Sequence, residues 1–144
     1  MFKHLLCLLA SALLMGKAVA AVKEPITILD NFTLGQTNLD AYIAEKSKVC
    51  SVTQQRDLYL LPGSCYQSDA LISANLRKTG KSVELRFHPQ ALEEIRVILV
   101  SKYGKPKKTE KSGIAVWLLG HYHILLAPAS DLQGDTVGLH CWMD

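Results

Sequence analysis

The chain has 144 residues, of which 49% are hydrophobic and 20% are charged, and its formal net charge is +3. This length suits a single domain that buries its own core. So small a net charge argues against a nucleic-acid partner, because proteins that bind phosphates need a strongly basic surface to displace counterions.

The first 20 residues have the three parts of a secretory signal peptide. A short positive segment precedes an apolar run over 5–15, and Ala18-Val19-Ala20 supplies the small residues of a cleavage site. The run is shorter than the roughly 20 residues of a membrane-spanning helix, so a cleaved leader is favoured over a retained anchor. We therefore expect a mature domain over 21–144, periplasmic or secreted, without stable membrane insertion. Loss of the two leader lysines, Lys3 and Lys17, lowers the net charge from +3 to +1.

Three cysteines lie in the mature domain, namely Cys50, Cys65 and Cys141. In an oxidising compartment thiols tend to pair. The favoured pair is Cys50 with Cys65, on either side of a turn at Pro62-Gly63, because closing a loop of about 15 residues stabilises a fold by about 3 kcal/mol. Cys65–Cys141 and Cys50–Cys141 are the alternatives, and each choice leaves one thiol that is either buried and inert or paired between chains.

The first half of the domain reads as extended chain, helix and strands. An extended segment over 21–36 leads to a helix from Asn38 to about Lys48, with Thr37 as its expected cap and Asp40 three residues on. Strands are predicted over 49–52, 57–61 and 65–67, whereas 71–76 fits either a strand or one helical turn. Thr79-Gly80-Lys81 predicts a hairpin, and strict alternation over 82–87 predicts a half-buried strand.

The second half repeats a helix followed by strands. Leu92, Ile95, Leu99 and Tyr103 form an apolar stripe, so a helix is predicted from Pro89 to Tyr103, ended by Gly104 and Pro106. Strands are predicted over 114–119 and 122–127, joined by a hairpin at Gly120-His121, and a loop over 128–135 leads to a last strand over 136–142. The sequence thus predicts one α+β domain of antiparallel hairpins covered on one side by two helices, in the order helix, strands, helix, strands.

Two segments carry a family resemblance. Gly35-Gln36-Thr37 leads into the first helix, and Lys102-Tyr103-Gly104-Lys105-Pro106 ends the second, before a hairpin that bears Trp117. In these segments the chain resembles small periplasmic proteins of the β-lactamase inhibitor protein type and small outer-membrane assembly lipoproteins, although it lacks the lipobox cysteine of the latter. The resemblance implies binding through a sheet face or loops, without chemistry.

Candidate binding residues lie near the C-terminus. On one continuous strand His121 and His123 could share a zinc ion, with His140 or Asp144 as a further ligand. The predicted turn at Gly120-His121 favours turn and surface histidines instead, so no metal and no other cofactor is expected. Trp142 fits either a core residue of the last strand or a contact anchor. The candidate binding residues are Trp142, Tyr122, His121 and His123.

The sequence contains no nucleophile elbow, phosphate loop, dinucleotide fingerprint or H-E-x-x-H motif, and no catalytic residue is expected. The leading hypothesis is an exported binding protein with a protein partner in the envelope, such as an inhibitor or immunity protein against a secreted or cell-wall-acting enzyme. The alternatives are an accessory subunit of an envelope or secretion assembly, and a small metal-binding protein or hydrolase.

Overall fold

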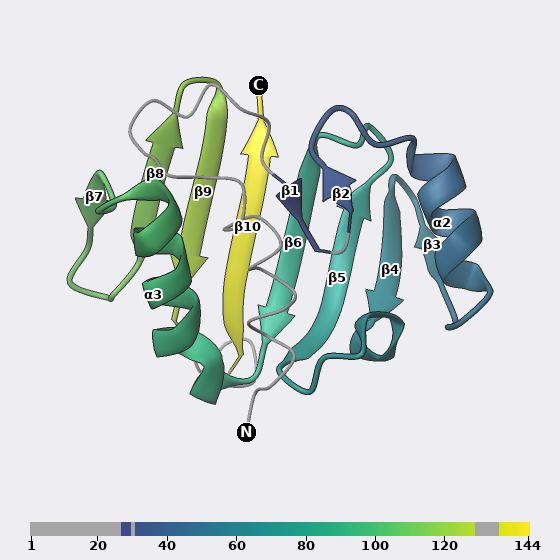
Figure 1. Cartoon of the computed structure of the whole chain (residues 1–144), viewed down its shortest axis with the longest axis horizontal. Helices are drawn as coiled ribbons and strands as arrows, with labels where there is room; N and C mark the ends of the chain where they lie inside the picture. Colours follow the sequence, from purple (N-terminus) through teal and green to yellow (C-terminus); the bar gives the residue numbers. More distant parts are fainter. Residues whose placement is uncertain (1–26, 30, 129–135) are drawn as a thin grey trace.

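A computed structural model describes residues 27–29, 31–128 and 136–144, and the predicted leader lies outside these residues. Within them the chain is an α+β protein with two α-helices, a two-stranded hairpin and an eight-stranded antiparallel sheet (Figure 1). The α+β class and the antiparallel pairing agree with the sequence.

The first half of the chain supplies the hairpin, one helix and four strands of the large sheet. Strands β1 and β2 pair with each other ahead of the first helix, so this half begins with strands rather than with the helix. In chain order the elements are β1 (Thr27–Ile28), β2 (Phe32–Thr33), α2 (Leu39–Ser47), β3 (Thr53–Gln55), β4 (Leu58–Pro62), the 3-10 helix η1 (Gly63–Tyr66), β5 (Leu71–Arg77) and β6 (Ser82–Phe87).

The second half supplies the other helix and the remaining four strands. Its elements are the 3-10 helix η2 (Pro89–Ala91), α3 (Leu92–Tyr103), β7 (Lys108–Thr109), β8 (Ala115–Leu119), β9 (Tyr122–Ala127) and β10 (Val137–Met143). The strand order is β3-β4-β5-β6-β10-β9-β8-β7. Each half therefore contributes a meander of four strands, and the two meanders meet where β6 pairs with β10.

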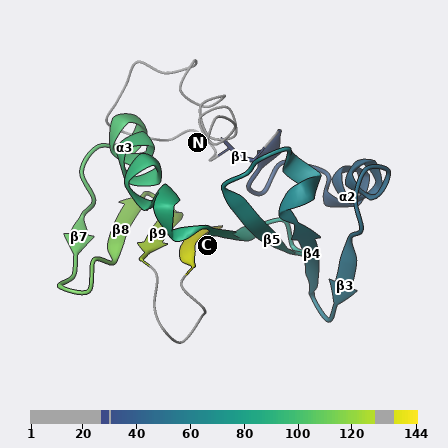
Figure 2. The same cartoon turned by 90° about the horizontal axis from the view of Figure 1, so that it is seen from below.

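The hydrophobic core lies on one side of this sheet. Successive side chains of a strand point to opposite faces. On β6, for example, Val83, Leu85 and Phe87 are buried while Ser82 and Glu84 are not. Figure 2 shows α2, α3 and the β1–β2 hairpin on the same side of the sheet. These elements bring their own buried side chains to the core, namely Leu39, Ile95, Leu99 and Phe32. We call the other side of the sheet the open face.

The cap of the first helix differs from the prediction. Asn38 is the N-cap, because its side-chain oxygen accepts a hydrogen bond from the backbone N–H of Ala41 at 3.1 Å. The Thr37 hydroxyl instead accepts a hydrogen bond from the N–H of Thr33 at 2.7 Å, closing the turn after β2. Two adjacent residues could each cap this helix, and the preceding turn takes one of them. The assignment of Thr37 as the cap was therefore wrong.

The predicted strands around the cysteines were partly wrong. Segment 65–67 is not a strand, because Cys65 belongs to η1, and 49–52 precedes the first strand of the sheet, which begins at Thr53. The short edge strand β7 was not predicted. Gly63 allows η1 to pack closely, since a Cβ at this position would lie 2.0 Å from the carbonyl oxygen of Leu71. The ambiguous segment 71–76 forms most of β5, and the hairpin over 79–81 is confirmed.

The favoured disulfide is confirmed. Cys50 and Cys65 are joined, with their Cα atoms 5.2 Å apart, and the bond ties the chain that follows α2 to η1. Cys141 is free and buried on β10. Burial raises the pKa of the Cys141 thiol, so this thiol stays protonated and poorly reactive.

Removing the disulfide should destabilise the protein. The double variant Cys50→Ser, Cys65→Ser is expected to lose about 3 kcal/mol of unfolding free energy, because the unfolded chain regains the entropy of a loop of about 15 residues. Urea denaturation without reductant measures the loss. Reductant should lower the stability of the wild type by a similar amount and leave the double variant unchanged. A double variant as stable as the wild type would contradict this account.

Candidate functional site

The open face carries a row of side chains that crosses five strands. Asn75, Glu84 and His140 lie opposite one another on β5, β6 and β10, and Leu125 and Val116 continue the row on β9 and β8. All five are intermediate in burial, whereas the neighbouring row on the other face is buried. The register therefore places polar groups on the central strands of the open face and apolar groups beside them.

Aliphatic side chains flank the centre of the open face on both sides. Leu58 and Leu60 lie on β4, and Val116, Leu118 and Leu125 lie on β8 and β9. Leu118 is 43% exposed, and the other four are partly exposed. A single exposed aliphatic residue is ordinary, but a group of them gathered on one face marks a surface that another molecule can cover.

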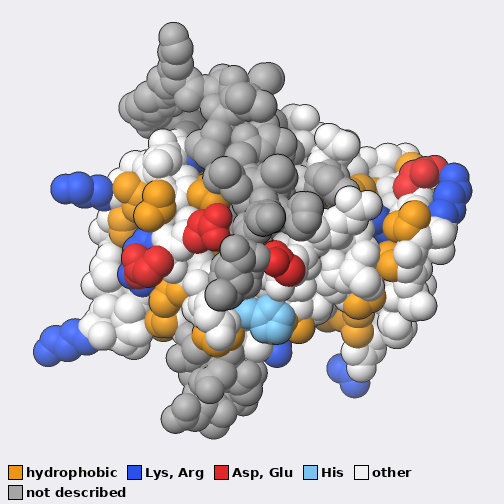
Figure 3. All heavy atoms as spheres, turned by 60° about the horizontal axis from the view of Figure 1, so that its bottom comes forward, with side chains coloured by type: hydrophobic (Ala, Val, Ile, Leu, Met, Phe, Trp, Pro, Cys, Tyr) orange, Lys and Arg blue, Asp and Glu red, His pale blue; other side chains and the backbone are white. Residues whose placement is uncertain are grey.

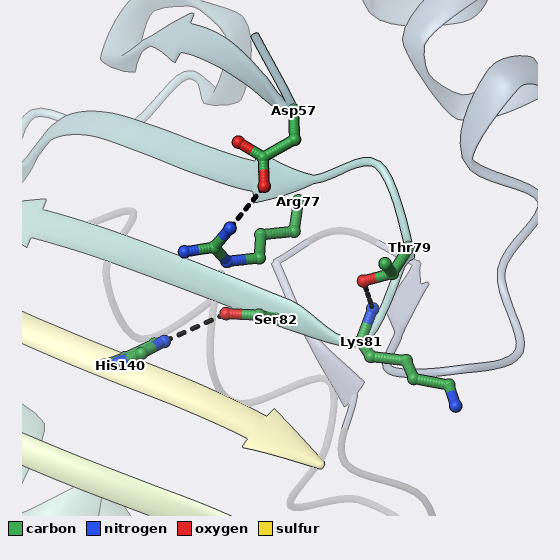
Figure 4. Close-up of polar contacts among 6 residues, drawn as sticks. All are labelled: Asp57, Arg77, Thr79, Lys81, Ser82 and His140. Atoms are coloured by element: carbon green, nitrogen blue, oxygen red, sulfur yellow. Dashed lines mark hydrogen bonds and ion pairs between the residues drawn. The ribbon is translucent and has the colours of Figure 1, made fainter. Parts of the chain in front are cut away.

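A cluster of aromatic rings lies on the neighbouring strands β9 and β10 of this face. The Trp142 ring stacks on the His123 ring with centroids 5.0 Å apart and planes 6° apart, and it contacts the His140 ring at 4.6 Å. His140 Nε2 shares a hydrogen bond of 2.9 Å with the Ser82 hydroxyl (Figure 4). His123 Nε2 lies 3.1 Å from a carboxylate oxygen of Asp144. We call these five residues, Ser82, His123, His140, Trp142 and Asp144, the Trp142 cluster.

The basic side chains of the open face have acidic neighbours. Figure 4 shows the ion pair of Arg77 with Asp57 beside the Ser82–His140 hydrogen bond. Arg86 lies 4.0 Å from Glu84. At the edge of the sheet, Lys108 Nζ lies 3.4 Å from Glu110. Because these pairs largely cancel in charge, the described residues of this face form no basic stripe that would attract a polyanion.

The surroundings of His140 favour its neutral form. Burial lowers the pKa of His140 from its ordinary value of 6.5; the nearby Glu84 carboxylate acts in the opposite direction and Arg77 lowers the pKa further. Desolvation penalises the charged imidazolium, and it is the largest of the three effects. His140 is therefore mostly uncharged at neutral pH, with one ring nitrogen able to accept a hydrogen bond.

The Ser82–His140 pair has the residue types of a nucleophile and its base. Such a pair becomes catalytic when backbone N–H groups also converge on the reacting oxygen. Ser82 and His140 lie on the two central strands of the sheet, and each of these strands pairs with a neighbour on both sides. The backbone N–H groups of these strands are therefore used in strand pairing. We therefore interpret the hydrogen bond as one that holds the His140 ring in place against Trp142.

The structure separates the four predicted binding residues. Trp142 and His123 lie together on the open face, and Trp142 does not belong to the buried core. The other interpretation, a contact anchor, stays a prediction. Tyr122 is buried, only 5% exposed, and His121 lies in the turn between β8 and β9 with its ring 4.4 Å from that of Tyr122. Among the described residues no three His, Cys, Asp or Glu side chains lie together as metal ligands would.

Sequence reasoning missed Ser82 and named His140 only as a possible zinc ligand beside His121 and His123. The alternation over 82–87 already placed Ser82 opposite to Val83, and His140 stands two residues before Trp142 on the same strand. Two residues that are two positions apart on a strand share a face. That spacing was the available signal for His140, whereas its contact with Ser82 depends on the pairing of β6 with β10.

Another face of the molecule carries both hydrophobic and charged side chains. In the view of Figure 3, the hydrophobic side chains form several separate groups among charged ones.

None of the helices in the described part of the chain has the length and apolar content needed to cross a membrane. Comparisons with models of protein families, with curated proteins and with solved structures found no match.

The two tryptophans should differ in their effect on stability. Trp117 is 1% exposed, and its indole N–H donates a hydrogen bond of 2.8 Å to the carbonyl of Gly104. Trp117→Ala should therefore cost about 3–5 kcal/mol of unfolding free energy. Trp142→Ala should cost about 1 kcal/mol, because it removes ring contacts but leaves no core cavity. Urea denaturation, monitored by circular dichroism, compares the unfolding free energies of the two variants. Equal losses would contradict the position of Trp142 outside the core.

Proposed function

We propose that this protein is an exported binding module without enzymatic activity and that the open face binds a protein partner. The observation that carries the proposal is the asymmetry of the sheet. Helices and a hairpin cover one side, whereas the other side presents the Trp142 cluster between two groups of partly exposed aliphatic side chains. A partner that covered these side chains would remove their exposed apolar surface from water, and this burial would favour binding.

The composition of the open face suits a protein partner. Protein interfaces combine aromatic and aliphatic side chains at their centre with polar groups around them, and tryptophan is frequent among the residues that dominate binding. Trp142 lies near the end of β10, one of the two central strands, and the ion pairs of Arg77 and Lys108 lie on strands nearer the edges of the sheet. A sheet held by strand pairing also presents its side chains in fixed positions, which lowers the entropy lost on binding.

The proposed partner is a secreted or cell-wall-acting enzyme that the protein inhibits or neutralises. Two features support a site of action outside the cytoplasm: the leader expected over 1–20, and the disulfide between Cys50 and Cys65, which suits an oxidising compartment. The resemblance to inhibitors of the β-lactamase inhibitor protein type adds the expectation that a sheet face or loops make the contact. The order from α2 onward, a helix and four strands followed by a helix and four strands, is compatible with that plan.

A pair of matched variants tests the open face. Leu118 on the open face is 43% exposed, and Val97 on α3 is 62% exposed. Each is replaced by lysine, and the mature chain over 21–144 serves as bait in an envelope extract of the native host. We expect the wild type and Val97→Lys to retain the same protein, whereas Leu118→Lys should bind it at least tenfold more weakly, since a buried lysine at an interface loses its hydration.

Calorimetry with the purified captured protein gives the affinities. If Leu118→Lys binds as tightly as the wild type, or if only Val97→Lys loses binding, the open face is not the binding surface. The identity of the captured protein separates the two binding functions. An enzyme whose activity falls at a stoichiometric ratio supports an inhibitor, whereas a component of a membrane-associated assembly supports an accessory subunit.

A further inference from the structure

His140 occupies a central position on the open face. It lies on β10, which together with β6 forms the middle of the eight-stranded sheet. One side of its ring contacts Trp142, and its Nε2 is engaged with Ser82. A partner that covers Trp142 must therefore also cover His140 and remove the water that still reaches this half-buried ring.

The charged and titratable groups around His140 come from four strands. Glu84 lies directly opposite His140 on β6 and is itself near Arg86, while Arg77 at the end of β5 is paired with Asp57. These opposite charges partly cancel at the ring. The groups on the side of Trp142 are His123 on β9 and Asp144 at the end of β10, which interact with each other.

We propose that proton binding at His140 regulates the open face, so that a protein partner binds at neutral pH and is released on acidification. This inference rests on the proposed function, because it concerns the same surface. We expect the covered ring to be uncharged. The Ser82 hydroxyl can accept a hydrogen bond from the Nε2–H of an imidazolium, but the described residues offer its second N–H no acceptor once water is excluded.

The sign of the effect follows from linkage. Covering His140 withdraws solvent from it and lowers its pKa further in the complex than in the free protein. The free protein then binds more protons than the complex at acidic pH, and the affinity falls as the pH drops through the pKa of His140 in the free protein, which lies below 6.5. Burial already lowers the pKa of His140 in the uncomplexed chain, in agreement with this direction.

Proton NMR of the free protein tests the starting point. The His140 imidazole signal, assigned by its absence in His140→Gln, should titrate with a midpoint below the ordinary 6.5. If His140 showed no titration between pH 4.5 and 7.5, the proposal would be overturned, since the ring would then bind no proton on mild acidification.

Binding measurements test the regulation itself. With the captured protein of the preceding experiment, the dissociation constant measured one pH unit below the His140 midpoint should exceed that at pH 7.5 about threefold or more, and one proton limits the change to about tenfold per pH unit. In His140→Gln the ratio of the two constants should approach one, even if the affinity itself falls. His88→Gln, altered at an exposed histidine outside the sheet, should retain the wild-type ratio.

The outcomes separate the two proposals. Equal affinity at both pH values, tighter binding at the lower pH, or an unchanged ratio in His140→Gln would overturn the regulation, whereas the proposed binding surface would be unaffected. If Leu118→Lys binds as tightly as the wild type at both pH values, the binding surface itself is wrong and the regulation falls with it.

Discussion

The pairing of β6 with β10 is the contact on which the rest of the molecule depends. Each strand ends one of the two meanders, and their antiparallel register sets Leu85 opposite Leu139 in the core and Glu84 opposite His140 on the open face. Ser82 and His140 are 58 residues apart in sequence and become hydrogen-bond partners only through this pairing. The core and the candidate site therefore arise from a single long-range contact.

The register of β10 is strongly specified by what its two faces carry. Cys141 is 1% exposed in the core, and Trp142, the next residue, stands on the open face. A shift of one residue would move Trp142 into the core and expose Leu139 and Cys141, because side chains alternate along a strand. The stability of the core thus fixes where Trp142 and His140 stand, although neither side chain belongs to the core.

Local patterns in the sequence predicted the elements well but not their neighbours. Alternation over 82–87 and the apolar stripe of α3 reflect which face of each element is buried, and this information is contained in the segment itself. The 3-10 helix at Cys65 could not be read from its own residues, because the disulfide and the close approach of Gly63 to Leu71 shape it. Trp142 had two interpretations for the same reason, since its face depends on the strands beside it.

Under the proposed function, the open face has to remain soluble until a partner covers it. Its aliphatic side chains are split into two groups by the polar row of Asn75, Glu84 and His140, and paired charges lie at its margins. This division keeps the continuous apolar area small, which limits self-association through the face. The polar groups carry a penalty when a partner excludes water from them, so the partner must satisfy them or find them uncharged. His140 meets that condition by losing its proton, and for this reason the most polar part of the face is also the part able to make binding conditional.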